Sequence, residues 1–312
     1  DTKYLDSNFI KAIYIWKNFN NNKKVEYRPN DCLPIICLHY AITKALEGEK
    51  EVAQNYFESI ERGSFSSYRI KELLLSNALS FNKPNAQKLL DELEKNDLNI
   101  KKYDLNFLNQ NNYLLNPILN QQHGMAEVLY NISSWFFSKD LYKYSAFFGK
   151  LSLKLRPEFN AMKLLFFGAL EKLDYQYLGI KLVEEIDPKN FYYYKFLKIK
   201  LSLFEDQNKD DEFLTNLQEF IEEHPERIEM KVLFADKHRR LEKYKKAIKL
   251  YSDIIENDSP PSKWNILYSR GISYERLDDW SKAEKDLEEA MSLQPQDAYI
   301  INYLAYSWLD RK

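Results

Sequence analysis

The chain has 312 residues, of which 45% are hydrophobic and 29% charged; this composition provides ample core and excludes a disordered polypeptide. Its formal net charge of −2 gives no general attraction for nucleic-acid backbones or anionic membranes, so no nucleic acid is expected as a partner. With only 7 glycines and 10 prolines, the chain has few signals for the tight turns of strand-rich folds, and its long periodic segments indicate an all-α protein.

The first third of the chain, residues 1–98, predicts a single helix followed by two helical pairs. The single helix runs from about Ser7 to Phe19. Apolar residues then recur at helical spacing at Cys37, Tyr40, Ala41, Ala53, Phe57 and Ile60, and again at Ile70, Leu73, Leu74, Ala86, Leu90 and Leu93. We interpret this part as a divergent N-terminal extension.

Two cysteines, Cys32 and Cys37, fall near the first of these pairs. If both lie within one helix, their spacing places the Cα atoms farther apart than a disulfide normally spans. We therefore interpret both as small buried apolar residues and expect no disulfide. No zinc-binding spacing is present, so cysteine usage leaves the compartment open.

Residues 99–123 are rich in asparagine and lack a helical repeat frame. They predict an irregular connector of short helical turns, which is the expected place for a hinge or a binding insertion.

A recurring frame of small and large apolar residues fills the rest of the chain, residues 124–312. Its clearest copy runs from Trp264 to Pro295, with the packing positions Leu267, Gly271, Tyr274, Ala283, Leu287 and Ala290. Small residues at Gly271 and Ala283 let two helices cross closely, and the larger residues fill the wedge beside them. Pro295 cannot continue the second helix and closes the unit.

This pattern resembles the tetratricopeptide repeat, with Arg270 as the clear departure because the family often has Leu there. The same frame begins again at Glu127, Phe159, Tyr194 and Ile228. The resemblance implies a right-handed α-solenoid of antiparallel helix-turn-helix repeats.

The last segment, Ala298 to Lys312, predicts a lone first helix of a further repeat. We expect the natural protein to continue past Lys312, because the outer face of such a helix normally meets a second helix. Exported bacterial tetratricopeptide proteins show similar sequence here. That resemblance favours the bacterial periplasm or cell envelope, with the cytoplasm as the alternative.

Signatures of enzymes are missing: there is no Walker loop, dinucleotide fingerprint, nucleophile elbow or zinc-protease motif. The four histidines (His39, His123, His224, His238) are far apart in sequence, so structural roles are favoured over metal binding or base catalysis. We expect no catalytic residue, no cofactor, no metal and no membrane-spanning helix.

Two local clusters have both a functional and a structural interpretation. The basic run from Lys237 to Lys246 suits an acidic peptide, but it also suits a solvated helix end. The aromatic run from Phe191 to Tyr194 suits a ligand platform, but it also suits the packing between repeats. The structural interpretation is favoured for both.

In the tetratricopeptide family the concave groove is lined by the second, fifth, ninth and twelfth residues of each repeat. Here these positions hold Glu229, Val232, Asp236, Arg239, Asn265, Tyr268, Ile272, Glu275, Tyr299, Asn302, Tyr306 and Leu309. The resemblance therefore predicts a non-catalytic scaffold that binds a peptide or helix of a partner protein in this groove. The alternatives are a recruiting or regulatory region of a larger enzyme, and a structural homo-oligomer; neither the partner nor the oligomeric state can be read from the residues.

Overall fold

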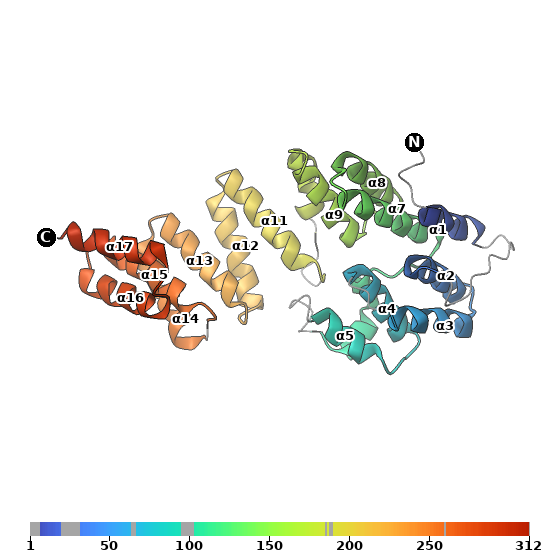
Figure 1. Cartoon of the computed structure of the whole chain (residues 1–312), viewed down its shortest axis with the longest axis horizontal. Helices are drawn as coiled ribbons and strands as arrows, with labels where there is room; N and C mark the ends of the chain where they lie inside the picture. The colour runs from blue at the N-terminus through green and yellow to red at the C-terminus, as the bar shows by residue number, and fades with distance from the viewer. Residues whose placement is uncertain are drawn as a thin grey trace. The chain divides into compact units, whose positions relative to one another are not determined.

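A computed structural model describes residues 7–19, 32–63, 67–94, 103–184, 186, 190–258 and 260–311 (Figure 1). Every regular element within these ranges is a helix, which confirms the predicted all-α class. The chain forms two compact units, residues 1–200 and 201–312, and each is described by itself. The predicted boundary at residues 98 and 99 falls in 95–102, outside the described residues.

Unit 1 contains short helices joined mostly by tight turns. In chain order these are α1 (Ser7–Asn18), α2 (Pro34–Leu46), α3 (Lys50–Glu61), α4 (Tyr68–Ser80), α5 (Ala86–Glu94), α6 (Leu105–Gln110), η2 (Asn112–Leu115), α7 (Gln121–Phe137), α8 (Tyr142–Leu155), α9 (Asn160–Glu171), η3 (Gln176–Leu178) and α10 (Ile180–Glu184). Consecutive helices such as α2 and α3, or α7 and α8, pack as antiparallel pairs.

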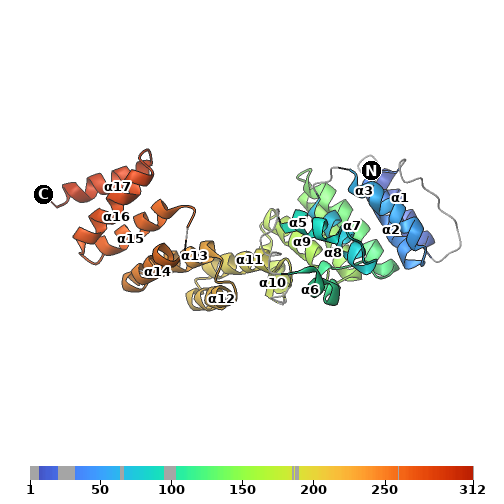
Figure 2. The same ribbon diagram turned by 90° about the horizontal axis from the view of Figure 1, so that it is seen from below.

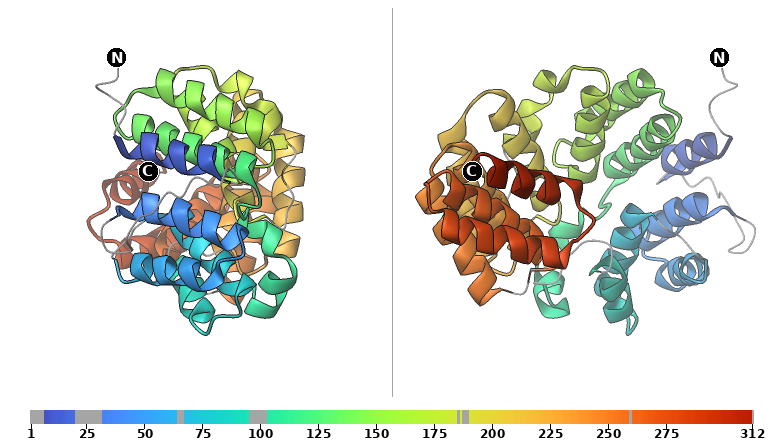
Figure 3. Two further views of the ribbon diagram at one scale, coloured as in Figure 1. Left: turned by 90° about the vertical axis from the view of Figure 1, so that its right-hand side faces the viewer. Right: turned by 60° about the vertical axis from the view of Figure 1, so that its left-hand side comes forward.

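Helix α1 lies between α2 and α7, although α7 begins far along the chain; the left view of Figure 3 shows it between them. Its Trp16 is fully buried and lies directly against Gly124 of α7. The Trp16 Nε1 donates a hydrogen bond of 2.9 Å to Nδ1 of buried His39 on α2. One indole thus joins three helices.

The expectation for the cysteines was wrong: Cys32 and Cys37 form a disulfide. Helix α2 begins only at Pro34, a residue type that suits the first helical position because it has no N–H to leave unbonded. Cys32 therefore precedes the helix, and its Cα lies 5.6 Å from that of Cys37, within disulfide range.

A buried polar cluster joins α4 to α7. The Arg69 guanidinium donates to both carboxylate oxygens of Glu127, with Nη2 2.8 Å from Oε2. It also bonds Glu72 and the backbone oxygens of Leu115 and Asn116. These side chains are almost fully buried, so their charges are balanced by one another rather than by water.

Helix α11 (Tyr193–Asp206) crosses the limit between the units, and unit 2 continues with α12 (Asp210–Glu223), α13 (Ile228–Arg240), α14 (Tyr244–Asn257), α15 (Lys263–Glu275), α16 (Trp280–Leu293) and α17 (Ala298–Leu309). Figure 2 shows α15, α16 and α17 stacked in succession. Helices α13 and α15 each pack on the helix that follows and on the helix before, and α17 packs on α16. This is the predicted tetratricopeptide-type arrangement.

The turn inside each repeat contains one residue with left-handed backbone. These residues are Asp140, Asp174, Asn208 and Glu242, at intervals of 34, followed by Asp278. Asp and Asn tolerate this conformation better than other non-glycine residues, and the next residue's N–H bonds back to a carbonyl of the preceding helix. The interval equals the length of a tetratricopeptide repeat.

At the seam between α14, α15 and α16, the unusual Arg270 is paired. Its Nε and Nη2 donate to the two carboxylate oxygens of Asp286, at 2.7 and 2.8 Å, and Nη1 donates to Oγ of Ser252 at 2.9 Å. Arg270 of α15 thus connects α14 and α16 through hydrogen bonds.

Candidate functional site

The predicted groove residues lie along α13, α15 and α17, all within unit 2. None is buried: Glu229, Asn265, Asn302 and Leu309 are exposed, whereas Val232, Asp236, Ile272 and Glu275 are half-buried. Tyr299 and Tyr306 are the most open, at 79% and 68% exposure. Every member of the set therefore has some of its surface exposed.

At the α13 end, Arg239 and Asp236 are linked to a tyrosine of the second helix. The Tyr251 hydroxyl donates to Oδ1 of Asp236 at 2.6 Å, and Arg239 Nη2 lies 3.9 Å from the same oxygen. Burial and the negative charge of Asp236 raise the pKa of Tyr251. Arg239 keeps a buried Nε without a hydrogen-bond partner among the described residues.

Tyr268 forms the centre of the surface and Glu275 its polar edge. The ring of Tyr268 packs edge-on against Tyr303 of α17, with 5.8 Å between centroids. The Tyr303 hydroxyl donates to Oε2 of Glu275 at 3.2 Å, and Arg311 Nη2 lies 3.2 Å from Oε1. Burial and the charge of Glu275 raise the pKa of Tyr303 to about 12.

Sequence reasoning missed Tyr303 and Arg311. Neither lies at a family groove position, and Arg311 follows the last helix. Its guanidinium lies over the Trp280 ring, 4.2 Å from the centroid, which holds it beside Glu275. The signal that was available is the spacing of Tyr303 four residues from Tyr299, on the same helix face.

The first part of the basic run is paired with acids inside unit 2. Buried Lys237 lies 2.8 Å from Asp210, and Arg240 Nη1 lies 2.7 Å from Glu205. His238 is buried, and burial together with Lys246 and Lys243 lowers its pKa to about 4. These contacts support the structural interpretation for Lys237, His238 and Arg240.

The aromatic run is likewise part of a core, as the structural interpretation predicted. Phe191 is fully buried against Tyr103, and the Tyr192 hydroxyl donates to Oε2 of Glu72 at 2.6 Å.

Burial lowers the pKa of His39 to about 4, so this histidine is neutral at pH 7. The described residues contain no group of three or more His, Cys, Asp or Glu arranged to hold a metal ion.

In the part of the chain that the structure describes, no helix has the length and apolar character needed to cross a membrane.

A family model described as "Tetratricopeptide repeat" matches residues 264–297. Residues 264–297 are thus a tetratricopeptide repeat, the family that the motif indicated. No curated protein matches the chain.

Among solved structures, the chain is similar to YrrB, described as a TPR protein with an unusual peptide-binding site. That match has 14% identity, covers 57% of this chain and 91% of that one, and has a TM-score of 0.46. A tetratricopeptide repeat protein from Parabacteroides merdae shows 13% identity over 87% and 97% of the two chains, with a TM-score of 0.36. The P58(IPK) TPR domain shows 15% identity over 96% and 97%, with a TM-score of 0.33.

Proposed function

We propose that this chain is a non-catalytic scaffold that binds a peptide or helix of a partner protein on the face formed by α13, α15 and α17. Solenoids of this type typically offer extended surfaces for protein partners. The observation that carries the proposal is the pair of exposed tyrosines Tyr299 and Tyr306 on α17, together with the half-buried pair Tyr268 and Tyr303. Tyrosine is enriched at binding hot spots because it offers a large rigid surface with a polar tip.

The test replaces the two most exposed tyrosines together, Tyr299→Ala and Tyr306→Ala. Tyr268 and Arg239 stay in place because they have packing and ion-pair roles of their own. The matched control is Tyr144→Ala with Tyr177→Ala, which removes two tyrosines of similar exposure, 57% and 63%, from unit 1.

Affinity capture from the native cell followed by mass spectrometry should identify partners that the wild type and the control retain. The groove variant should bind these partners at least about tenfold more weakly, as expected for the loss of hot-spot residues. Equal capture by the groove variant and the wild type would show that this face is not the binding surface.

A second candidate, self-association through α17, is favoured by the apolar side chains that this helix leaves open. Ile301 and Trp308 are 41% and 39% exposed, and Leu309 is 64% exposed. Light scattering across a concentration series would show a rising mass, and Ile301→Asp should abolish the rise. A constant monomer mass would exclude this candidate.

We also propose that the chain works in an oxidising compartment, because the Cys32–Cys37 disulfide persists only where thiols are not kept reduced. Alkylation of free thiols in freshly lysed cells should leave both cysteines unlabelled. Full labelling before reduction would contradict the proposal.

A further inference from the structure

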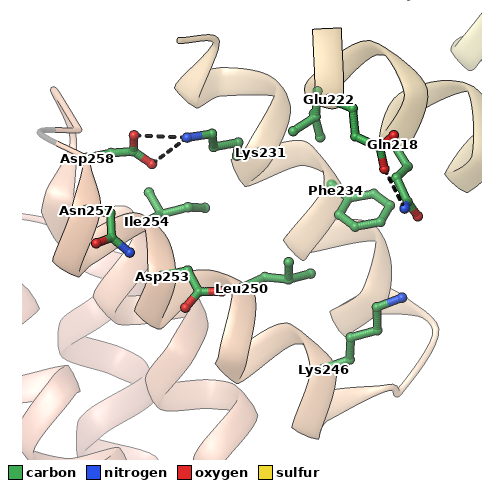
Figure 4. Close-up of a pocket in the computed structure, with 11 residues that line it drawn as sticks. Gln218, Glu222, Lys231, Phe234, Lys246, Leu250, Asp253, Ile254, Asn257 and Asp258 are labelled. Carbon is green, nitrogen blue, oxygen red and sulfur yellow. Dashed lines mark hydrogen bonds and ion pairs between the residues drawn. The ribbon is translucent and has the colours of Figure 1, made fainter. Parts of the chain in front are cut away.

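A pocket of about 440 Å³ opens at the seam between α12, α13 and α14 (Figure 4). Its floor is apolar: Phe234 and Ile254 are buried there, with half-buried Leu250 and Ile221 beside them. None of the groove residues of α13, α15 and α17 lines it. The volume falls in the range of ligand-binding pockets, about 300–1,000 Å³.

The seam at the pocket lacks the polar bridge that spans the next seam. Phe234 and Leu250 lie 36 residues before Arg270 and Asp286, at the same repeat positions, and Gln218 lies 34 residues before Ser252. In the next seam, Arg270 is hydrogen-bonded to both Ser252 and Asp286. In this seam, the phenyl ring of Phe234 and the alkyl side chain of Leu250 take the places of Arg270 and Asp286. The Gln218 amide is bonded within α12 instead, to Glu222 Oε1 at 2.9 Å.

Two lysines, Lys231 and Lys246, lie at the rim of the pocket, and they differ in their partners among the described residues. At one end, Lys231 Nζ is held by both carboxylate oxygens of Asp258, at 2.9 and 3.0 Å. Lys246, on the same wall as Leu250, is exposed, and its Nζ lies 5.5 Å from the centroid of the Phe234 ring. Among the described residues, no carboxylate lies within ion-pair distance of Lys246.

An apolar floor containing a phenyl ring, with an ammonium group beside it, suits an aromatic group that carries or neighbours an acid. The ring of the ligand would pack against Phe234 and the acid would pair with Lys246. The rim also carries Gln218, Asn257 and two carboxylates, Glu222 and Asp253, all of them exposed. The pocket is therefore open to the surface, and Lys246 is the rim group that favours an acid. An open pocket admits a side chain that remains attached to a polypeptide.

We propose that this pocket binds an aromatic side chain of a partner protein, presented by a segment with an acidic residue next to it, whose carboxylate pairs with Lys246. This site is separate from the groove face and does not depend on it.

The probe is a capped peptide of two aspartates, a tryptophan and two glycines, titrated into the full chain with labelled isoleucine methyl groups. The peptide should bind saturably with a Kd of about 1 mM or tighter, a modest value that suits a single anchoring side chain. The methyl signals of Ile221 and Ile254 should shift. The signal of Ile272, on the groove face, should not, and this distinguishes the pocket from the proposed groove.

The decisive variant copies the neighbouring seam: Gln218→Ser, Phe234→Arg and Leu250→Asp together. Because the same set is hydrogen-bonded across the seam at α15, the variant should keep its helical content while binding falls at least about tenfold, as expected when apolar contact area is lost. Leu250→Glu alone is the second variant and should weaken binding in the same direction.

Lys246→Gln should weaken binding of the acidic peptide about two- to fivefold, the usual range for an exposed ion pair, and leave a peptide with asparagines in place of the aspartates unchanged. The proposal is overturned if the wild type shows no saturable binding, if the shifts appear at Ile272 instead, or if the seam-copy variant binds as well as the wild type. Free indole-3-acetate binding more tightly than the peptide would also overturn it, in favour of a small-molecule ligand.

Discussion

Arg270 shows how a change at one repeat position is matched by changes at its neighbours. The residue sits where the family often has Leu, yet Asp286, only 4% exposed, and Ser252 supply the acceptors that its guanidinium needs. A bidentate contact of this geometry is among the stronger ion pairs. Either partner alone would be a poorly solvated charge.

Removing one partner of this pair should therefore lower the free energy of unfolding more than removing both. We expect Arg270→Leu to lower the free energy of unfolding by about 2–4 kcal/mol, because Asp286 then remains buried without a cation. The double change Arg270→Leu with Asp286→Leu should recover most of that loss. A double-mutant cycle by urea unfolding measures the coupling, and additive effects would show that the pair contributes nothing.

Glu72 is a second residue whose surroundings change its chemistry, in this case its pKa. Burial, which outweighs the opposing effect of Arg69, raises its pKa from 4.5 to about 7, and its Oε1 has no hydrogen-bond partner. A carboxyl group with a raised pKa in the folded state contributes stability in full below pH 4.5, and that contribution is lost as the pH rises through about 7. The contribution of His39 to stability has the opposite pH dependence, because its lowered pKa makes the fold more stable as the pH rises from about 4 to 6.5.

Glu72→Gln should separate these two effects. The amide mimics the protonated carboxyl, so the variant should match the wild type below about pH 4.5 and exceed its free energy of unfolding by about 1–3 kcal/mol at pH 8. The measurement is urea unfolding at a series of pH values. A constant difference between the two proteins across that series would exclude titration of Glu72 in this range.

At the scale of elements, the contact between α1 and α7 depends on one missing β-carbon. A methyl group at Gly124 would overlap the indole of Trp16, whereas one at Gly168 in α9 would meet only ring carbons of Phe137 at 3.6 Å or more. Both glycines lie within helices. They form a matched pair for the same substitution.

Gly124→Ala should lower the free energy of unfolding by about 2 kcal/mol or more, since Trp16 must move out of a close-packed site. Gly168→Ala should raise it by about 0.5–1 kcal/mol, because alanine is the better helix former and has room. Thermal unfolding of both variants beside the wild type is the measurement. The reverse order would mean that Trp16 does not pack against α7.

The sequence predicted the helices and the family frame because their signals are local: apolar spacing, small residues at crossings and a closing proline. The prediction that the cysteines form no disulfide failed because Pro34 was not recognised as the first residue of the helix, which leaves Cys32 outside it. The turn residues from Asp140 to Asp278 were a further signal of the 34-residue period that went unused. The pocket beside Phe234 could not be predicted from the sequence, since it depends on how neighbouring repeats meet in space.

At the scale of the whole molecule, the placement of α1 is the feature that no local pattern indicates. Elements adjacent in sequence usually lie side by side, but α1 joins α2 to α7, and Gln121 Nε2 bonds the Trp16 backbone oxygen 105 residues away. Unit 2 has no such inserted helix among its described residues; its helices follow chain order.

Deletion of residues 1–19 should therefore weaken unit 1 alone. Amide hydrogen exchange should become faster in α2 and α7, which lose the face that α1 covers, and stay unchanged in α15 and α16. Mass spectrometry of the deletion variant and the full chain gives both readouts at once. Equal exchange in α7 would contradict the predicted dependence on α1.

The position of α1 between α2 and α7 also means that the two units can form their helix contacts at different times during synthesis. A helix pair of unit 2 can close as soon as its second helix has emerged from the ribosome. Helix α1 instead waits for a partner 105 residues downstream, which at about 5–20 residues per second is an interval of roughly 5–20 s. Throughout that interval the Trp16 face has no α7 to cover it, so an apolar surface of α1 stays open to other proteins while the chain is being made.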